Sequence, residues 1–171
     1  MKKLVLLSVS LLILGGACAT TMRPTATATL APTSGSTAHG TVTFTELSDG
    51  MVEVKVSLAG VPPGSTHGFH VHDKGDCGDN GNAAGGHFNP MNTPHGAPDA
   101  PAHHAGDFGN VDADANGTVN VTRMLHGITV SPGPTSVVGH AVILHANPDD
   151  LTTQPTGNAG ARIACGVVQM K

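Results

Sequence analysis

The residues of this chain best suited to chemistry are histidines placed beside apolar side chains. Phe69 and Val71 alternate with His70 and His72. On a β-strand the apolar pair would face a core while both imidazoles project from the opposite face. Two such rings, about 7 Å apart at their Cα atoms, can converge on one metal ion. An isolated pair could equally be two exposed histidines, so the interpretation depends on the residues that follow.

Further histidines and two aspartates follow at spacings that argue against a chance cluster. Imidazole nitrogens and carboxylate oxygens are the usual protein ligands of d-block metals. The candidate ligands are His70, His72, His87, His95, His104, Asp107 and His145, with Asp149 just behind them. We therefore predict two metal sites that overlap.

The segments that must position these residues have an apolar period of two. Val52 to Leu58 alternates apolar with polar side chains, and Ser48-Asp49-Gly50 forms a turn before it. Such alternation is typical of half-buried strands. It recurs at Gly117–Arg123, Val137–His145 and Ile163–Gln169, whereas Thr25–Leu30 could be a first strand or the end of a linker. We predict an all-β sandwich or barrel of about eight strands.

Two long stretches interrupt the strands. Asp73 to Gly109 and Ala146 to Ala161 are rich in Gly, Asn, Asp, Pro and His. Loops of this length in a compact domain are usually functional. Most of the candidate ligands lie inside or beside them.

The composition limits the possible partners. The chain has 171 residues, which suits one domain. Without Lys2 and Lys3, which lie in a segment expected to be removed, 6 basic residues face 12 acidic ones, a formal charge of −6. This charge argues against nucleic acid or an anionic membrane surface as partner, and the absence of Trp and Tyr removes the usual stacking platforms.

Residues 1–19 resemble an export signal, with two lysines, an apolar run too short to span a bilayer, and small residues before the cleavage point. Cleavage after Ala19 and lipidation of Cys18 are both compatible with it, and residues 20–24 would form a short linker. Cys77 and Cys165 then remain as one pair. Export to an oxidising compartment favours a disulfide between them over two free thiols.

Four separated motifs resemble the Cu,Zn superoxide dismutases. They are Gly68-Phe-His-Val-His72, Gly86-His-Phe-Asn-Pro90, His104-Ala-Gly-Asp-Phe-Gly-Asn110 and Gly157-Asn-Ala-Gly-Ala-Arg-Ile-Ala-Cys-Gly166. The likeness runs from about Thr25 to the C-terminus, with the motifs in the family's order. It implies an eight-stranded Greek-key barrel or sandwich of immunoglobulin-like type in residues 25–171, with two long functional loops.

The resemblance also implies the cofactors, one copper and one zinc per subunit, and their ligands. Copper would be bound by His70, His72, His87 and His145, and zinc by His87, His95, His104 and Asp107. His87 would bridge both ions. Asp149 would accept hydrogen bonds from His70 and His95, and Arg162 would guide the substrate anion to copper. The implied reaction is the dismutation of superoxide to dioxygen and hydrogen peroxide, in which His87 takes up and delivers a proton.

Some features depart from the best-known cytosolic members. The Asp150 to Thr156 loop is short and lacks their run of charged residues, which makes the chain more similar to exported bacterial members of the periplasm or cell envelope. Those members pair through aromatic residues that are absent here, so either a monomer or a homodimer is possible. Cys18 could supply a lipid anchor.

Two other functions compete with this interpretation. A non-catalytic member of the same fold could buffer or deliver copper, but it would need neither the bridging His87 nor Arg162. A copper-only enzyme would lack the zinc ligands that are present here. The sequence Asp112 to Gly117 imitates half of a calcium loop, but Arg123 occupies the position that requires Glu, so we predict a polar turn there. His67 is predicted to be structural, and His39, His103 and His126 to be exposed.

Overall fold

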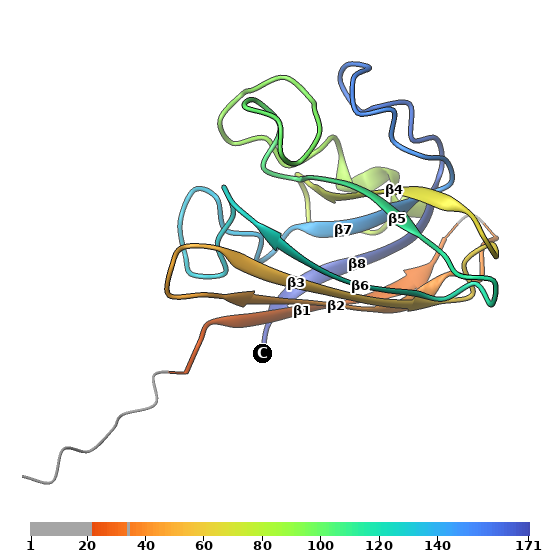
Figure 1. The fold of residues 1–171 in the computed structure, drawn as a ribbon, viewed down its shortest axis with the longest axis horizontal. Helices are drawn as coiled ribbons and strands as arrows, with labels where there is room; N and C mark the ends of the chain where they lie inside the picture. Colours follow the sequence, from red (N-terminus) through yellow and green to blue (C-terminus); the bar gives the residue numbers. More distant parts are fainter. Residues whose placement is uncertain (1–21, 34) are drawn as a thin grey trace, which may run out of the picture.

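The computed structural model describes residues 22–33 and 35–171, so the predicted signal segment 1–19, including Cys18, lies outside the described residues. Eight antiparallel strands form a nearly closed barrel (Figure 1). They are β1 (Thr25–Pro32), β2 (His39–Glu46), β3 (Val52–Ala59), β4 (Thr66–His72), β5 (Asp107–Asp112), β6 (Val119–Leu125), β7 (Ala141–His145) and β8 (Arg162–Met170), and a short 3-10 helix, η1, spans Asp79–Ala84. None of the described helical segments is long and apolar enough to cross a membrane.

The strand order around the barrel is β5-β4-β7-β8-β1-β2-β3-β6. The chain passes from β3 to β4 and from β6 to β7, which are not neighbours, and these crossings give the Greek-key connections that the resemblance implied. Within the described residues, backbone pairing does not join β5 to β6, so the barrel has one open seam.

The core follows from the alternation seen in the sequence. On β3, the apolar residues Val52 to Leu58 are buried at every second position. Three phenylalanines fill the interior, with the Phe108 ring 6.2 Å from Phe44 and 6.1 Å from Phe69. The prediction of an all-β fold of about eight strands is therefore confirmed.

Several predicted boundaries were wrong. The strand expected at Val137–His145 begins only at Ala141, because Gly139 has φ +87° and His140 donates to the carbonyl of Val137 in a turn. The strand expected from Gly117 starts at Val119, since Gly117 also lies in a left-handed turn.

The structure decides the ambiguous first segment and shortens the first long loop. The ambiguous segment Thr25–Leu30 is part of β1, which pairs with both β2 and β8. The long loop after β4 contains η1 and ends earlier than predicted, because β5 begins at Asp107.

Glu46 at the end of β2 offers a pH-dependent test of this fold. Its carboxylate accepts hydrogen bonds from the backbone N–H groups of Ser131 (2.6 Å) and Val130 (2.8 Å). These bonds, led by that of Ser131, lower the pKa of Glu46. A lowered pKa stabilises the fold above the unfolded-state value, near 4.5, and this stabilisation is lost as the pH falls through the folded-state pKa.

We therefore expect Glu46→Gln to lower the free energy of unfolding at pH 7 by roughly 1 kcal/mol, because one charge-assisted acceptor is lost at a partly solvated site. Urea unfolding of the metal-free protein at pH 7 and at pH 3 measures this difference. Glu53→Gln, which removes a partly exposed carboxylate paired with Lys55, is the matched control. A Glu46→Gln deficit as large at pH 3 as at pH 7 would contradict the expectation.

Candidate metal centre

The two long loops cover β4 and β7 on the outside of the barrel (Figure 1). The candidate ligands come from these loops, from β4 and β7, and from the start of β5. On β4, Phe69 and Val71 point into the core while His70 and His72 project from the opposite face, as the alternation predicts. The loops bury these outward histidines almost completely, which the strand pattern alone could not show.

The side chains form two groups that share one histidine. In each group the possible ligand atoms all lie within 4.8 Å of one another. The four-histidine group consists of His70, His72, His87 and His145, and the aspartate-containing group consists of His87, His95, His104 and Asp107. All the histidines and the aspartate are buried.

Hydrogen bonds on the outer ring nitrogens orient the four-histidine group. His70 Nε2 contacts Asp149 Oδ2 at 2.7 Å, and His72 Nδ1 contacts the carbonyl of Gly85 at 2.9 Å. His145 Nδ1 contacts a backbone carbonyl of the following loop at 3.2 Å. The opposite nitrogens are therefore directed inward, and those of His72 and His145 lie 3.2 Å apart.

The aspartate-containing group converges on one carboxylate oxygen. Asp107 Oδ1 lies 2.7 Å from His87 Nδ1, 3.0 Å from His95 Nδ1 and 3.2 Å from His104 Nδ1. The other oxygen, Oδ2, accepts from the backbone N–H groups of His104 (2.8 Å) and Gly96 (3.1 Å). In a tetrahedral zinc site neighbouring ligand atoms lie roughly 3.3–3.6 Å apart, so these side chains need to separate by only about half an ångström.

Unpartnered nitrogens show that the residues present fit metal ions. Among the described residues, the buried side-chain atoms without a hydrogen-bond partner are His70 Nδ1, His87 Nε2, His95 Nδ1 and His104 Nδ1. Orphaned polar atoms are costly inside a protein, and coordination to metal would satisfy all four. All four atoms belong to members of the two groups defined above.

The protonation states also suit metal binding. Burial holds the pKa values of His70 and His72 well below the usual range and lowers the pKa of His145 to about 4. These rings are therefore neutral near pH 7, as metal ligands must be. Burial would raise the pKa of Asp107, but the hydrogen bond from His87 and two backbone N–H groups hold it well below its usual range. Asp107 is accordingly anionic, as a carboxylate ligand would have to be.

The comparisons with known proteins agree with this geometry. The family model for copper/zinc superoxide dismutase (SODC) matches residues 38–168. The chain belongs to the copper/zinc superoxide dismutase family. The crystal structure of the clock protein EA4 is similar to it, with a TM-score of 0.78 and 39% sequence identity over 88% of this chain and 97% of that chain. Copper and zinc are the cofactors of the family, and the two groups supply suitable ligands for them.

In this member of the superoxide dismutase family, Asp149 links the two groups from behind. Its Oδ2 contacts His70 Nε2, and its Oδ1 contacts His95 Nε2 at 3.0 Å. Two residues whose role the sequence pattern does not reveal hold this carboxylate in place. The side-chain amide of Asn110 donates to the carbonyl of Asp149 and accepts from its backbone N–H. Gly157 packs against the Asp149 carboxylate.

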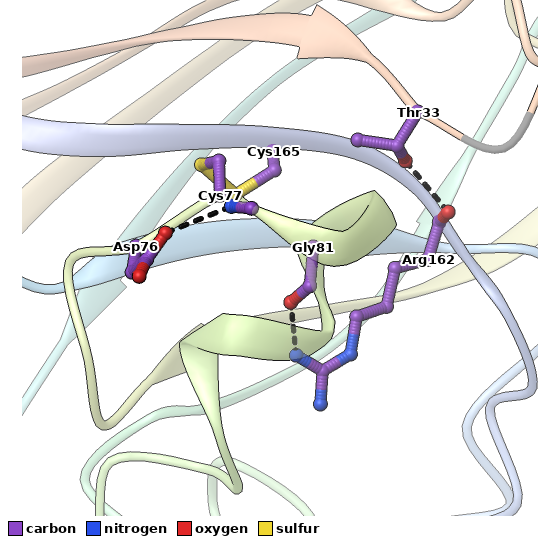
Figure 2. The surroundings of a disulfide bond; sticks show 7 residues. Thr33, Asp76, Cys77, Gly81, Arg162 and Cys165 are labelled. Atoms are coloured by element: carbon purple, nitrogen blue, oxygen red, sulfur yellow. Dashed lines mark hydrogen bonds between the residues drawn. A yellow bond between two sulfur atoms is a disulfide. The ribbon is translucent and has the colours of Figure 1, made fainter.

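Arg162 and the Cys77–Cys165 disulfide lie beside η1, as Figure 2 shows. Cys77 and Cys165 are bonded, with Cα atoms 5.7 Å apart. The guanidinium of Arg162 donates to the carbonyls of Gly81 and Gly85 in the loop that Cys77 anchors. The Gly85 carbonyl also receives the hydrogen bond of a histidine in the four-histidine group, so the arginine and that histidine share one anchor.

The other described histidines belong to neither group. His67 is buried, with its Nδ1 2.7 Å from the carbonyl of His145 and its Nε2 2.6 Å from Ser65 Oγ. His39 and His126 are exposed as expected. His103 was predicted to be exposed, but it is half-buried because its ring contacts the backbone of the next residue.

Proposed function

We propose that this protein is a superoxide dismutase that binds copper in the four-histidine group and zinc in the aspartate-containing group. Four imidazoles suit a copper ion that changes oxidation state, whereas three imidazoles and a carboxylate suit a tetrahedral, structural zinc. Bound copper would supply one-electron chemistry, accepting an electron from one superoxide and giving it to the next.

The position of His87 carries the proposal. Its Nδ1 lies 2.7 Å from Asp107 Oδ1, while its Nε2 is buried and unpartnered on the side of the four-histidine group. One ring thus presents a nitrogen to each group. A metal store has no use for such a shared ligand. In an enzyme, Nε2 can hold the proton that the peroxide product requires.

The residues around the site suit an anionic substrate. Arg162 is half-buried, and burial lowers its pKa, but guanidinium remains charged at any physiological pH. Its two carbonyl partners hold the side chain beside the four-histidine group. We assign to it the attraction and orientation of superoxide.

The test measures metal content per chain together with superoxide consumption. The wild-type protein is expected to bind one copper and one zinc and to consume superoxide rapidly. His145→Ala should lose copper and turnover while retaining zinc, whereas His126→Ala, which changes an exposed histidine, should match the wild type. Copper binding without turnover would overturn the proposal in favour of copper storage.

The dependence of the rate on salt tests Arg162 separately. Electrostatic guidance raises association rates by about 10-fold or more and is screened by salt. We expect Arg162→Ala to lower the rate about tenfold at low ionic strength and to flatten its salt dependence. Arg23→Ala removes an exposed arginine outside the site and is the matched control. An unchanged salt dependence in Arg162→Ala would refute this role.

We further propose that the protein is exported and protects the cell envelope from superoxide, with residues 1–19 as signal, 20–24 as linker and 25–171 as the enzyme domain. The Cys77–Cys165 disulfide supports export, because such bonds persist in oxidising compartments. The intact mass of the protein from its native cells decides the fate of Cys18. Cleavage after Ala19 and lipidation of Cys18 give different masses, and an uncleaved cytosolic product would contradict export.

A further inference from the structure

Arg123 lies at the seam where the barrel is not closed by backbone pairing. On β6, Val119, Val121 and Leu125 are the apolar side chains that face inward, and Arg123 lies at the inward-facing position between Val121 and Leu125. Its guanidinium donates from Nη1 to the carbonyl of Phe108 and from Nη2 to the carbonyl of Asn110, both on β5. The side chain thus supplies the cross-strand hydrogen bonds that the backbones of β5 and β6 do not make.

The placement of this arginine is costly. Arg123 is partly buried, and burial lowers its pKa, opposed by the charge of Asp112. A desolvated guanidinium is tolerated when its donors are satisfied, and the forked geometry of arginine can satisfy two carbonyls at once. An apolar residue would fit the alternation of β6 better, so the two carbonyls are the physical reason for a charge at this position.

The two carbonyls flank Gly109, in the segment that enters the metal centre. Gly109 has φ +71°, and a Cβ atom there would lie 3.5 Å from Arg123 Nη1 and 3.2 Å from Pro98. The segment begins with Asp107, the carboxylate of the aspartate-containing group. Arg123 therefore holds the backbone directly after that carboxylate.

The segment ends with Asn110, which connects to the second long loop. Asn110 Nδ2 donates to the carbonyl of Asp149 at 2.9 Å, and the backbone N–H of Asp149 donates to Asn110 Oδ1 at 2.7 Å. The carboxylate of Asp149 in turn contacts His70 and His95. A continuous set of hydrogen bonds therefore runs from Arg123 to one histidine in each group.

We infer that Arg123 is a positioning residue of the metal centre, which acts by fixing the carbonyls of Phe108 and Asn110 and, through them, Asp107 and Asp149. This inference rests on the metal binding proposed above. The competing interpretation is that Arg123 only links β5 to β6, which stabilises the barrel and leaves the metal centre unaffected. The two differ in whether zinc affinity changes when the arginine is removed.

The experiment compares Arg123→Met with Leu125→Ala, which removes a buried side chain from the same face of the same strand. Zinc affinity is measured by competition with a chelator, and cobalt(II) reports the geometry of the same site through its absorption spectrum. Loss of residues that orient metal ligands typically weakens binding by about 10- to 100-fold. We expect a loss in this range, with an altered cobalt spectrum, for Arg123→Met alone.

Two further variants keep the test decisive if Arg123→Met fails to fold. Arg123→Lys retains the charge but lacks the fork, so its zinc affinity should lie between those of the wild type and Arg123→Met. Asn110→Ala leaves the Arg123 contacts to backbone carbonyls in place and removes only the amide pair to Asp149, and it should also weaken zinc binding.

The inference would be overturned if both arginine variants kept the wild-type zinc affinity and cobalt spectrum while their unfolding stability fell as in Leu125→Ala. Arg123 would then serve only to stabilise the barrel. Wild-type zinc affinity in Asn110→Ala would overturn the route through Asp149. A wild-type protein that binds neither zinc nor cobalt would instead overturn the metal-binding proposal itself.

Discussion

Replacing Gly157 by alanine is expected to weaken zinc binding by about 10- to 100-fold, because the new methyl group would displace the carboxylate of Asp149, which is bonded to the proposed zinc ligand His95. A Cβ atom at Gly157 would lie 1.8 Å from Asp149 Oδ1 and 2.7 Å from His95 Nε2. Both distances are too short for a real Cβ contact, so the Asp149 carboxylate and the His95 ring, which are buried and bonded to each other, would have to shift. Chelator competition measures the loss, and bound copper is quantified in parallel because Asp149 also contacts His70.

Gly64→Ala is a closely matched control for this substitution. Gly64 has φ +66° and Gly157 has φ +64°, but a Cβ atom at Gly64 would meet nothing within 4 Å. Both variants therefore carry the strain of a left-handed alanine, roughly 1–2 kcal/mol, and only Gly157→Ala disturbs the carboxylate. Equal zinc affinities in the two variants would show that the contact with Asp149 has no bearing on the metal centre.

Removing the disulfide by Cys77→Ala/Cys165→Ala is expected to lower the free energy of unfolding by about 4 to 5 kcal/mol in the chain-entropy model. The bond closes a loop with a sequence separation of 88, so its loss frees a large part of the unfolded chain. Denaturant unfolding of the metal-free proteins measures the change. Activity of the metal-loaded variant should also fall, because the loop tied by Cys77 supplies both carbonyl partners of Arg162.

Reduced wild-type protein separates the cross-link from packing. Cys165 is buried against Ala84, Ala141 and Ile143, so the alanine variant also loses some apolar contact. If the cross-link is responsible, reduction of the wild type and the double substitution should destabilise the protein by similar amounts. A reduced wild type as stable as the oxidised one would contradict the prediction.

The strands could be predicted wherever burial on one side imposes alternation. β3 is the clearest case, because Val52 to Leu58 repeats the pattern over a whole strand. Strand ends were less predictable. The turn before Ala141 depends on a left-handed Gly139. The apolar Val137 resembles strand sequence, but its backbone N–H donates to the carbonyl of Thr129, outside the barrel strands.

The candidate site was predictable in residue type and partly in position. His70 and His72 project together because of strand periodicity, and the family resemblance named the remaining candidates. The sequence also marks Arg123 as unusual, because it is a charged residue at one of the alternating positions of β6 that are otherwise apolar. Its role could not be inferred, because its partners are backbone carbonyls of a strand that is adjacent only in the folded protein.

The sequence by itself determined that this chain forms an all-β domain with histidines and acidic residues of metal-binding type, because alternation and side-chain chemistry are local properties. The tertiary structure alone decided which ring nitrogen faces each group. Hydrogen bonds to Asp149, Gly85 and the second long loop orient the imidazoles, and their partners come from distant parts of the chain. The same long-range contacts place His87 between the two groups, with one nitrogen available to each.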